Sequence, residues 1–171
     1  MKLGTVDWLK TSCYLPDAFN PDRSGNWAEP DYLACYTDGA GSIAVVTKRY
    51  TGDTLAIDTF NPRTLRRIGS RRSISLAGWP CWGGFYAGAD GCFYVLVGRE
   101  NPNENDDREV VAVRRYDRNW TLLGTAYIQG SSDLTGGGIY SPFVGGAPHM
   151  VLVGERLVVH MGRLILSLIH I

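Results

Sequence analysis

The stretch from Trp79 to Gly130 carries short apolar runs separated by tight-turn signals, and this pattern constrains the fold more than any other feature. Asp90-Gly91 supplies the positive φ that a short β-hairpin needs. The run Cys92–Val97 has no polar interruption and is rich in aromatic and β-branched residues, which is typical of a strand covered on both faces. The pattern predicts four antiparallel strands, at Gly83–Gly88, Cys92–Val97, Glu109–Tyr116 and Trp120–Ile128.

A weaker copy of this pattern precedes it. Asp53–Ile74 overlays Glu109–Ile128 at an offset of about 55 residues, with one gap in the turn. Further upstream, Asp38-Gly39 matches Asp90-Gly91 and opens a similar apolar run. The copy predicts four more strands, near Tyr32–Tyr36, Ser42–Tyr50, Thr54–Phe60 and Arg67–Leu76.

A third copy begins at Phe143-Val144-Gly145-Gly146, which resembles Trp82-Gly83-Gly84. Two short strands are expected after it, at His149–Val153 and Arg156–His160. Gly154-Glu155 joins them as a two-residue turn with glycine first, a common hairpin connection.

Four strands in each period of about 50 residues fall in the range of β-propeller blades, whose inner strands are enclosed and whose outer strands meet water. The sequence therefore predicts an all-β fold, a partial β-propeller of about two and a half to three four-stranded antiparallel blades. An all-β sandwich whose hairpins happen to look alike is the alternative. The predicted parts are an irregular lead-in at 1–30, blades at 31–78 and 79–130, an incomplete third blade at 131–165, and a tail at 166–171.

A propeller usually needs four to eight blades, so we interpret the chain as part of a longer protein that supplies the remaining blades. The tail Leu166–Ile171 fits no repeat position. It resembles the translated read-through of a sequencing adapter and is left out of the fold prediction.

Composition excludes several classes. Hydrophobic residues make up 44% of the chain and charged residues 20%, which is typical of a folded globular protein. The formal net charge of +0 gives no general attraction to nucleic acid or to an anionic membrane. We recognise neither a signal peptide near Met1 nor an apolar run long enough to span a membrane.

The segment WGGFYAGADGCFYVLVGRENPNENDDREVVAVRRYDRNWTLLGTA resembles a group of secreted or cell-surface β-propeller-like repeat proteins of Gram-positive bacteria. The likeness covers Trp79–Thr125 well, the first copy weakly and the third only at its start. It implies an extracellular or cell-surface location and a modular parent with further blades. It implies no catalytic activity, so no active site is carried over.

Aromatic residues gather at the entry to the central repeat, where propellers often bind ligands near their axis. Trp79, Trp82 and Tyr86 are the candidate ligand-binding residues, with Phe85 beside them, because aromatic faces suit sugars and peptides. Packing between neighbouring blades is the alternative role for these rings, and we favour it.

Other polar groups give weaker signals. The loop Asn101–Asp107 is dense in oxygen atoms and could hold Ca²⁺, but it lacks the spacing of an EF-hand and reads more simply as a solvated loop. His149 and His160 could lie on adjacent strands, without a carboxylate or cysteine at ligand spacing. No metal or cofactor is predicted.

The cysteines and arginines leave alternatives open. Cys13, Cys35, Cys81 and Cys92 lack zinc-type spacing, although Cys81 and Cys92 flank a hairpin and could form a disulfide. Five arginines near the outer edge of the first copy form either an anion- or polysaccharide-binding strip or, as we favour, a charged edge that discourages strand pairing. They are Arg63, Arg66, Arg67, Arg71 and Arg72.

Three functions compete. The first is a non-catalytic module that recognises a surface polymer or a protein. The second is part of a propeller-fold glycosidase or polysaccharide lyase whose catalytic residues lie outside this chain, since no pair of carboxylates at glycosidase separation stands in the inner strands. The third is a purely structural repeat.

Overall fold

The computed structural model describes residues 32–49, 53–130, 138–144 and 147–164. These residues form an all-β structure without a helix, so none of them belongs to a helix long and apolar enough to cross a membrane. The lead-in at 1–30 and the tail at 166–171 lie outside the described residues. The first four-stranded sheet falls in one compact unit and all later strands in another, and each unit is described by itself.

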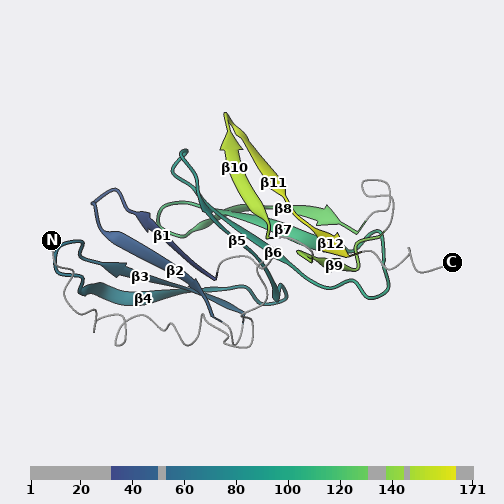
Figure 1. Cartoon of the computed structure of the whole chain (residues 1–171), viewed down its shortest axis with the longest axis horizontal. Helices are drawn as coiled ribbons and strands as arrows, with labels where there is room; N and C mark the ends of the chain where they lie inside the picture. The colour runs from purple at the N-terminus through teal and green to yellow at the C-terminus, as the bar shows by residue number, and fades with distance from the viewer. Residues whose placement is uncertain (1–31, 50–52, 131–137, 145–146, 165–171) are drawn as a thin grey trace. The chain divides into compact units, whose positions relative to one another are not determined.

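Two antiparallel four-stranded sheets are built from consecutive strands (Figure 1). The first runs in the order β1 (Leu33–Thr37), β2 (Ile43–Lys48), β3 (Thr54–Phe60) and β4 (Arg67–Ser75). The second runs in the order β5 (Cys81–Ala87), β6 (Phe93–Gly98), β7 (Glu109–Tyr116) and β8 (Leu122–Gln129). The predicted all-β, hairpin-connected organisation is therefore confirmed, and the two stretches do not interleave their strands.

The two sheets share their register as well as their order. Thr37 pairs with Ile43 across the first hairpin of one sheet, and Ala87 pairs with Phe93 at the same place in the other. The next pairs correspond in the same way, Ile43 with Phe60 and Phe93 with Tyr116. This correspondence, found in hydrogen-bond register, is stronger than the similarity of the two sequences.

The first hairpin of each sheet has a glycine in the left-handed conformation, and the sequence comparison chose the wrong glycine in the first sheet. Gly41 has a φ of 80° and so does Gly91, and each glycine lies two residues before its next strand. Asp38-Gly39 was predicted to match Asp90-Gly91, but Gly39 is not the left-handed residue. The side chain of Asp38 instead accepts hydrogen bonds from the backbone N–H of Ala40 and Ser42, at 3.0 and 2.7 Å.

The second sheet is centred on β6, all of whose residues are buried, as predicted for a strand covered on both faces. Leu96 packs with Val110 and Val111 of β7 and with Ile139 and Phe143 from later in the chain. Trp120 was predicted to begin the last strand, but it lies in the preceding turn, with a φ of 61°, and β8 begins at Leu122.

Four short strands complete the second unit. β10 (His149–Val153) and β11 (Arg156–His160) form the predicted hairpin, whose turn places Gly154 at a φ of 60°. β9 (Ser141–Pro142) pairs with β12 (Arg163–Leu164), so the third copy forms two two-stranded sheets among the described residues.

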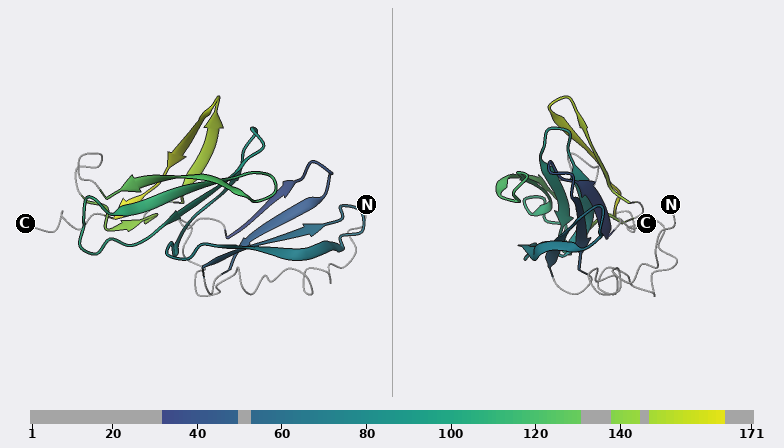
Figure 2. Two further views of the ribbon diagram at one scale, coloured as in Figure 1. Left: turned by 180° about the vertical axis from the view of Figure 1, so that it is seen from behind. Right: turned by 90° about the vertical axis from the view of Figure 1, so that its left-hand side faces the viewer.

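The β10–β11 hairpin rises from one face of the β5–β8 sheet, as Figures 1 and 2 show from three directions. Met150 and Val159 point from the hairpin toward that sheet and pack on the Leu96 cluster. β10 lies against β5, and the backbone N–H of Leu152 donates a hydrogen bond to the Tyr86 hydroxyl at 3.3 Å. We call this covered side of the β5–β8 sheet the hairpin face.

Candidate functional site

A β-bulge in β5 separates the aromatic residues that the sequence grouped as a binding site. Trp82 pairs with Val97 but Tyr86 pairs with Tyr94, and the register shifts between Trp82 and Gly84. A bulge adds one residue to one strand, which exchanges the faces of the residues that follow. Trp82 and Tyr86 therefore point to opposite faces of the sheet, because their partners Val97 and Tyr94 do.

The two tryptophans are mostly enclosed. Trp79 is 8% exposed and Trp82 6%. The Trp79 ring stacks on Tyr127, with centroids 5.8 Å apart, and the guanidinium of Arg99 lies 4.6 Å from its centroid. These are packing contacts within the second unit, and the packing between neighbouring blades favoured from the sequence stays a prediction. Ligand binding by Trp79, Trp82 and Tyr86 stays a prediction, and the structure does not bring the three together.

Tyr86 belongs to a row of side chains that crosses the whole hairpin face. Successive register pairs join Tyr86 to Tyr94, Tyr94 to Arg115, and Arg115 to Gly124 at the edge strand β8. The two tyrosine rings are 6.2 Å apart, and the Arg115 guanidinium lies 5.9 Å from the Tyr94 centroid. We call these four residues the Tyr94 row.

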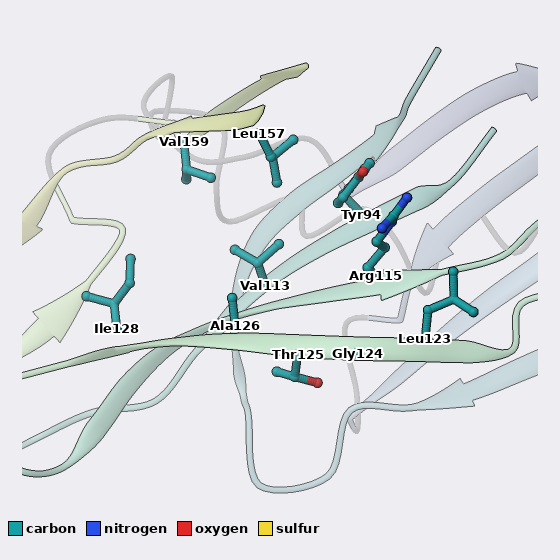
Figure 3. Close-up of a pocket in the computed structure, with 10 residues that line it drawn as sticks. All are labelled: Tyr94, Val113, Arg115, Leu123, Gly124, Thr125, Ala126, Ile128, Leu157 and Val159. Atoms are coloured by element: carbon teal, nitrogen blue, oxygen red, sulfur yellow. The ribbon is translucent and has the colours of Figure 1, made fainter. Parts of the chain in front are cut away.

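A cleft of about 550 Å³ lies over this row, between the sheet and β11. Figure 3 shows Leu157 and Val159 of the hairpin facing Val113, Ala126 and Ile128 of the sheet, while Thr125 points away. The whole lining consists of Tyr94, Val113, Arg115, Leu123, Gly124, Thr125, Ala126, Ile128, Leu157 and Val159. It is mainly apolar, and it contains no carboxylate and no histidine.

Small residues on β8 keep the cleft open at its outer side. Ala126 has a short side chain, and Gly124 has none. A Cβ atom added at Gly124 would meet no heavy atom within 4 Å. The cleft thus opens toward the edge of the sheet at the point where the Tyr94 row ends.

A polar cluster lies beside the two middle residues of the row, Tyr94 and Arg115. The carboxylate of Asp90 accepts a hydrogen bond from the Tyr94 hydroxyl at 2.7 Å and forms an ion pair with Arg115 at 3.0 Å. Burial opposes ionisation of Asp90, but the hydrogen bonds from Tyr94 and from the Cys92 N–H, with the Arg115 charge, lower its pKa. Burial and the hydrogen bond to Asp90 raise the pKa of Tyr94 to about 12. Tyr94 therefore stays a neutral donor at physiological pH.

Two arginines of the first unit contact a buried carboxylate of their own sheet. The carboxylate of Asp58, which is 3% exposed, binds the Arg71 guanidinium through contacts of 2.6 to 3.2 Å. Arg67 lies 3.7 Å from the same carboxylate. Two of the five arginines considered as an anion-binding strip thus neutralise a buried carboxylate of their own sheet, and the strip itself stays a prediction.

The amide side chain of Asn101 holds the loop after β6. Asn101 is 1% exposed, and its side chain exchanges two hydrogen bonds with the backbone of Asn105, at 3.0 and 3.1 Å. No group of three or more histidine, cysteine, aspartate or glutamate side chains suited to a metal occurs in the described part of the chain. His149 and His160 are direct cross-strand partners, as the sequence suggested.

The cysteines that flank the β5–β6 hairpin do not form a disulfide. Cys81 pairs with Gly98 at one end of the two strands, whereas Cys92 precedes Phe93, the partner of Ala87, at the other end. At about 3.3 Å per residue the two positions are roughly 20 Å apart along the strands, well beyond disulfide reach. Among the described residues, Cys35, Cys81 and Cys92 form no disulfide, and Cys13 lies outside them.

No protein-family model matches the sequence, and comparisons with curated proteins and with solved structures found no significant match. Function must therefore be argued from the site itself. The site combines apolar walls with two tyrosines and one guanidinium, and the Tyr94 hydroxyl is hydrogen-bonded to the Asp90 carboxylate. The sequence analysis missed Tyr94, Arg115 and Gly124, whose only local signal is strand alternation.

Proposed function

We propose that this chain is a sector of an extracellular or cell-surface β-propeller that acts as a non-catalytic recognition scaffold for a surface polymer or a protein. The observation that carries the proposal is the pair of four-stranded sheets with the same strand order, register and turn positions. Such repetition is expected of blades, each of which needs a neighbour to cover its faces.

The position of the third hairpin supports the same proposal. β10 is the first strand of the third copy and lies against β5, the first strand of the second. Blades stacked around an axis place corresponding strands next to each other. In this proposal β10 and β11 are the first two strands of a third blade, and a longer parent chain supplies the blades that close the ring.

The cleft supports a role in recognition. It combines an apolar wall with aromatic rings and a half-exposed guanidinium, and ligand sites in proteins commonly combine such groups. The location outside the cell comes from the resemblance of residues 82–126 to secreted and surface repeat proteins, and its support is that resemblance alone.

The test is a binding assay with the purified chain and insoluble cell-wall polysaccharide from Gram-positive bacteria, with purified surface proteins as a second panel. We expect binding to one of them that falls at least several-fold in Arg115→Gln and is unchanged in Arg63→Gln, a matched change in the other unit. The polymer should keep its length. Shortened or unsaturated products would support the carbohydrate-active enzyme instead, and absence of binding to both panels would refute the scaffold.

A further inference from the structure

The geometry points to the class of ligand: we infer that β8 accepts an extended peptide as a fifth strand of the β5–β8 sheet. Its alternate side chains enter the cleft, and a carboxylate side chain opposite Gly124 meets Arg115. The inference rests on the proposed recognition function and narrows it from any surface polymer or protein to an extended acidic peptide segment.

The edge strand β8 lacks the charged residues that the edge strand β4 carries. Both strands end their sheets, and no strand pairs with their outer edges among the residues with described positions. β4 carries three arginines in nine residues, whereas β8, Leu-Leu-Gly-Thr-Ala-Tyr-Ile-Gln, has eight residues and no charge. Charged residues discourage pairing at sheet edges, and a long uncharged edge strand is a template for another strand.

The cleft supplies what strand addition needs for specificity. An added strand gains affinity from main-chain hydrogen bonds, while pockets for its alternate side chains select the sequence. The cleft lies along β8 on the hairpin face, with Leu157 and Val159 of β11 on its far side. Side chains of an added strand that point to this face would enter it, and apolar ones match its lining.

Arg115 adds a charge preference at one position. It is the cross-strand partner of Gly124, so a residue opposite Gly124 on the added strand would extend the Tyr94 row. Strands lie about 4.8 Å apart, and Gly124 has no side chain to separate Arg115 from that residue. The Arg115 side chain is 50% exposed and contacts Asp90 through Nη2, which leaves other donors of its guanidinium for a second carboxylate.

The surroundings of this position also favour an acidic ligand. Arg118 lies beside Gly91, next to Asp90 in the same turn. Both guanidinium groups thus lie near Asp90, and Asp117 adjoins Arg118 in the turn before β8. A ligand carboxylate would give Arg115 a second partner, whereas a basic residue at the same place would meet like charge.

The experiment uses the full chain and an acetylated, amidated octapeptide probe in which threonine alternates with valine and one central valine is replaced by glutamate. Binding is measured by calorimetry, with a glutamine peptide as the neutral control. We expect the glutamate peptide to bind about five- to tenfold more tightly, as a charge-assisted hydrogen bond would give. Arg115→Gln should abolish the difference between the two peptides.

Two further comparisons test the geometry. Gly124→Val fills the gap between Arg115 and the ligand and should remove the preference for glutamate, whereas Gly39→Val, the same change at an open glycine of the first unit, should keep it. Probes N-methylated at the odd or at the even positions should differ, because only one set of N–H groups in an added strand faces β8.

Each outcome has a distinct meaning. Equal binding of both N-methylated probes would overturn strand addition. Failure of every peptide to bind, with binding to a cell-wall polymer or folded surface protein retained, would overturn this inference but leave the proposed function standing. Failure of the peptides together with a dimer that Leu123→Lys disrupts would assign the edge to a second copy of the chain.

Discussion

At the scale of single residues, the contact between Tyr94 and Asp90 links the stability of the sheet to proton binding. The hydroxyl donates to the carboxylate at 2.7 Å, and its ring is 6% exposed. Burial and this hydrogen bond favour the neutral phenol, since ionisation would put two negative charges side by side in a poorly solvated place. The pKa of Tyr94 is accordingly about 12 in the folded chain, against 10.0 as the ordinary value.

This contact predicts a loss of stability in alkaline solution. Between pH 10 and 12 the tyrosine ionises in the unfolded chain but stays protonated in the folded chain, so the unfolded state binds fewer protons and stability falls as pH rises. We expect the free energy of unfolding to fall more steeply across this range in the wild type than in Tyr94→Phe. Urea titrations at several pH values measure both slopes.

The neighbouring carboxylate provides the control for the alkaline prediction. Asp90→Asn keeps the shape of the side chain but removes its charge, so the pKa of Tyr94 should fall toward 10 and the alkaline loss of stability should become smaller and end at lower pH. The pKa of Asp90 itself is lowered, so its own contribution is present above the usual aspartate range and is lost in acid. Identical alkaline slopes in the wild type and Tyr94→Phe would contradict the assignment.

At the scale of the hairpins, both sheets use the same unusual turn between their third and fourth strands. Leu65 and Trp120 adopt left-handed φ values of 57° and 61°, which bulky residues rarely do. The preceding Asn61 and Asp117 hold each turn through side-chain oxygens that accept backbone N–H groups. At Trp120 the strain is offset by packing, because its ring contacts Tyr116 on the strand that it leaves.

Trp120 shows how much packing is set against that strain. Its ring lies 4.8 Å from the Phe93 ring, 5.6 Å from that of Tyr116 and 5.7 Å from that of Phe85. We predict that Trp120→Ala lowers the free energy of unfolding by about 3 kcal/mol, the usual cost of removing a large buried ring.

Trp120→Leu is the matched control, because Leu65 occupies the same turn position in the first sheet. It keeps an apolar side chain on the aromatic cluster and should cost clearly less than the alanine variant. Urea unfolding followed by fluorescence of the remaining tryptophans measures both. Equal losses in the two variants would mean that the backbone of the turn, rather than the ring, sets the stability.

These turns also explain what the sequence could predict. Hairpins depend on local chemistry. The sequence marks the turns at Gly91, Gly154, Asn61 and Asp117, and it therefore predicts the strands Thr54–Phe60 and Glu109–Tyr116 to the residue. The buried run of β6 was equally clear, because an apolar segment between glycines has few other uses.

The bulge in β5 could not be predicted in the same way. Gly84 has a φ of 127°, and a Cβ atom at Gly83 would lie 2.6 Å from Leu96 Cγ and 2.8 Å from Phe143 Cζ. Gly83 is therefore required by contacts with residues later in the chain, and Gly84 by its backbone conformation. The sequence placed Trp82 and Tyr86 together at the entry to the repeat, although the bulge sends them to opposite faces.

The candidate cleft was also beyond sequence reasoning. It exists because the β10–β11 hairpin docks on a sheet that ends some twenty residues earlier, and because β8 has Gly124 and Ala126 beneath it. Nothing in the alternation of β6 and β7 distinguishes the buried Tyr94 or the half-exposed Arg115 from other residues of these strands. The site is a property of tertiary packing.

At the scale of the whole molecule, the two outer strands differ in how they meet other molecules. Leu122 and Leu123 of β8 are 51% and 55% exposed, and Ile68 of β4 is 46% exposed. The apolar exposure of the two edges is thus similar, but only β4 places arginines around it. Association of the chain with itself, when no ligand covers the cleft, should therefore proceed through β8.

Leu123→Lys tests this expectation against Ile68→Lys, the same change at the corresponding position of the other sheet. We predict that Leu123→Lys raises several-fold the concentration at which the protein stays monomeric, because a lysine on an uncharged edge opposes pairing with a second copy. Ile68→Lys adds the same charge to an edge that arginines already protect, and should change little.

Light scattering with size-exclusion chromatography gives the mass of each variant over a concentration series. Equal gains in both variants would mean that net charge, rather than the β8 edge, controls association. A gain confined to Leu123→Lys would identify β8 as the surface through which copies of the chain meet.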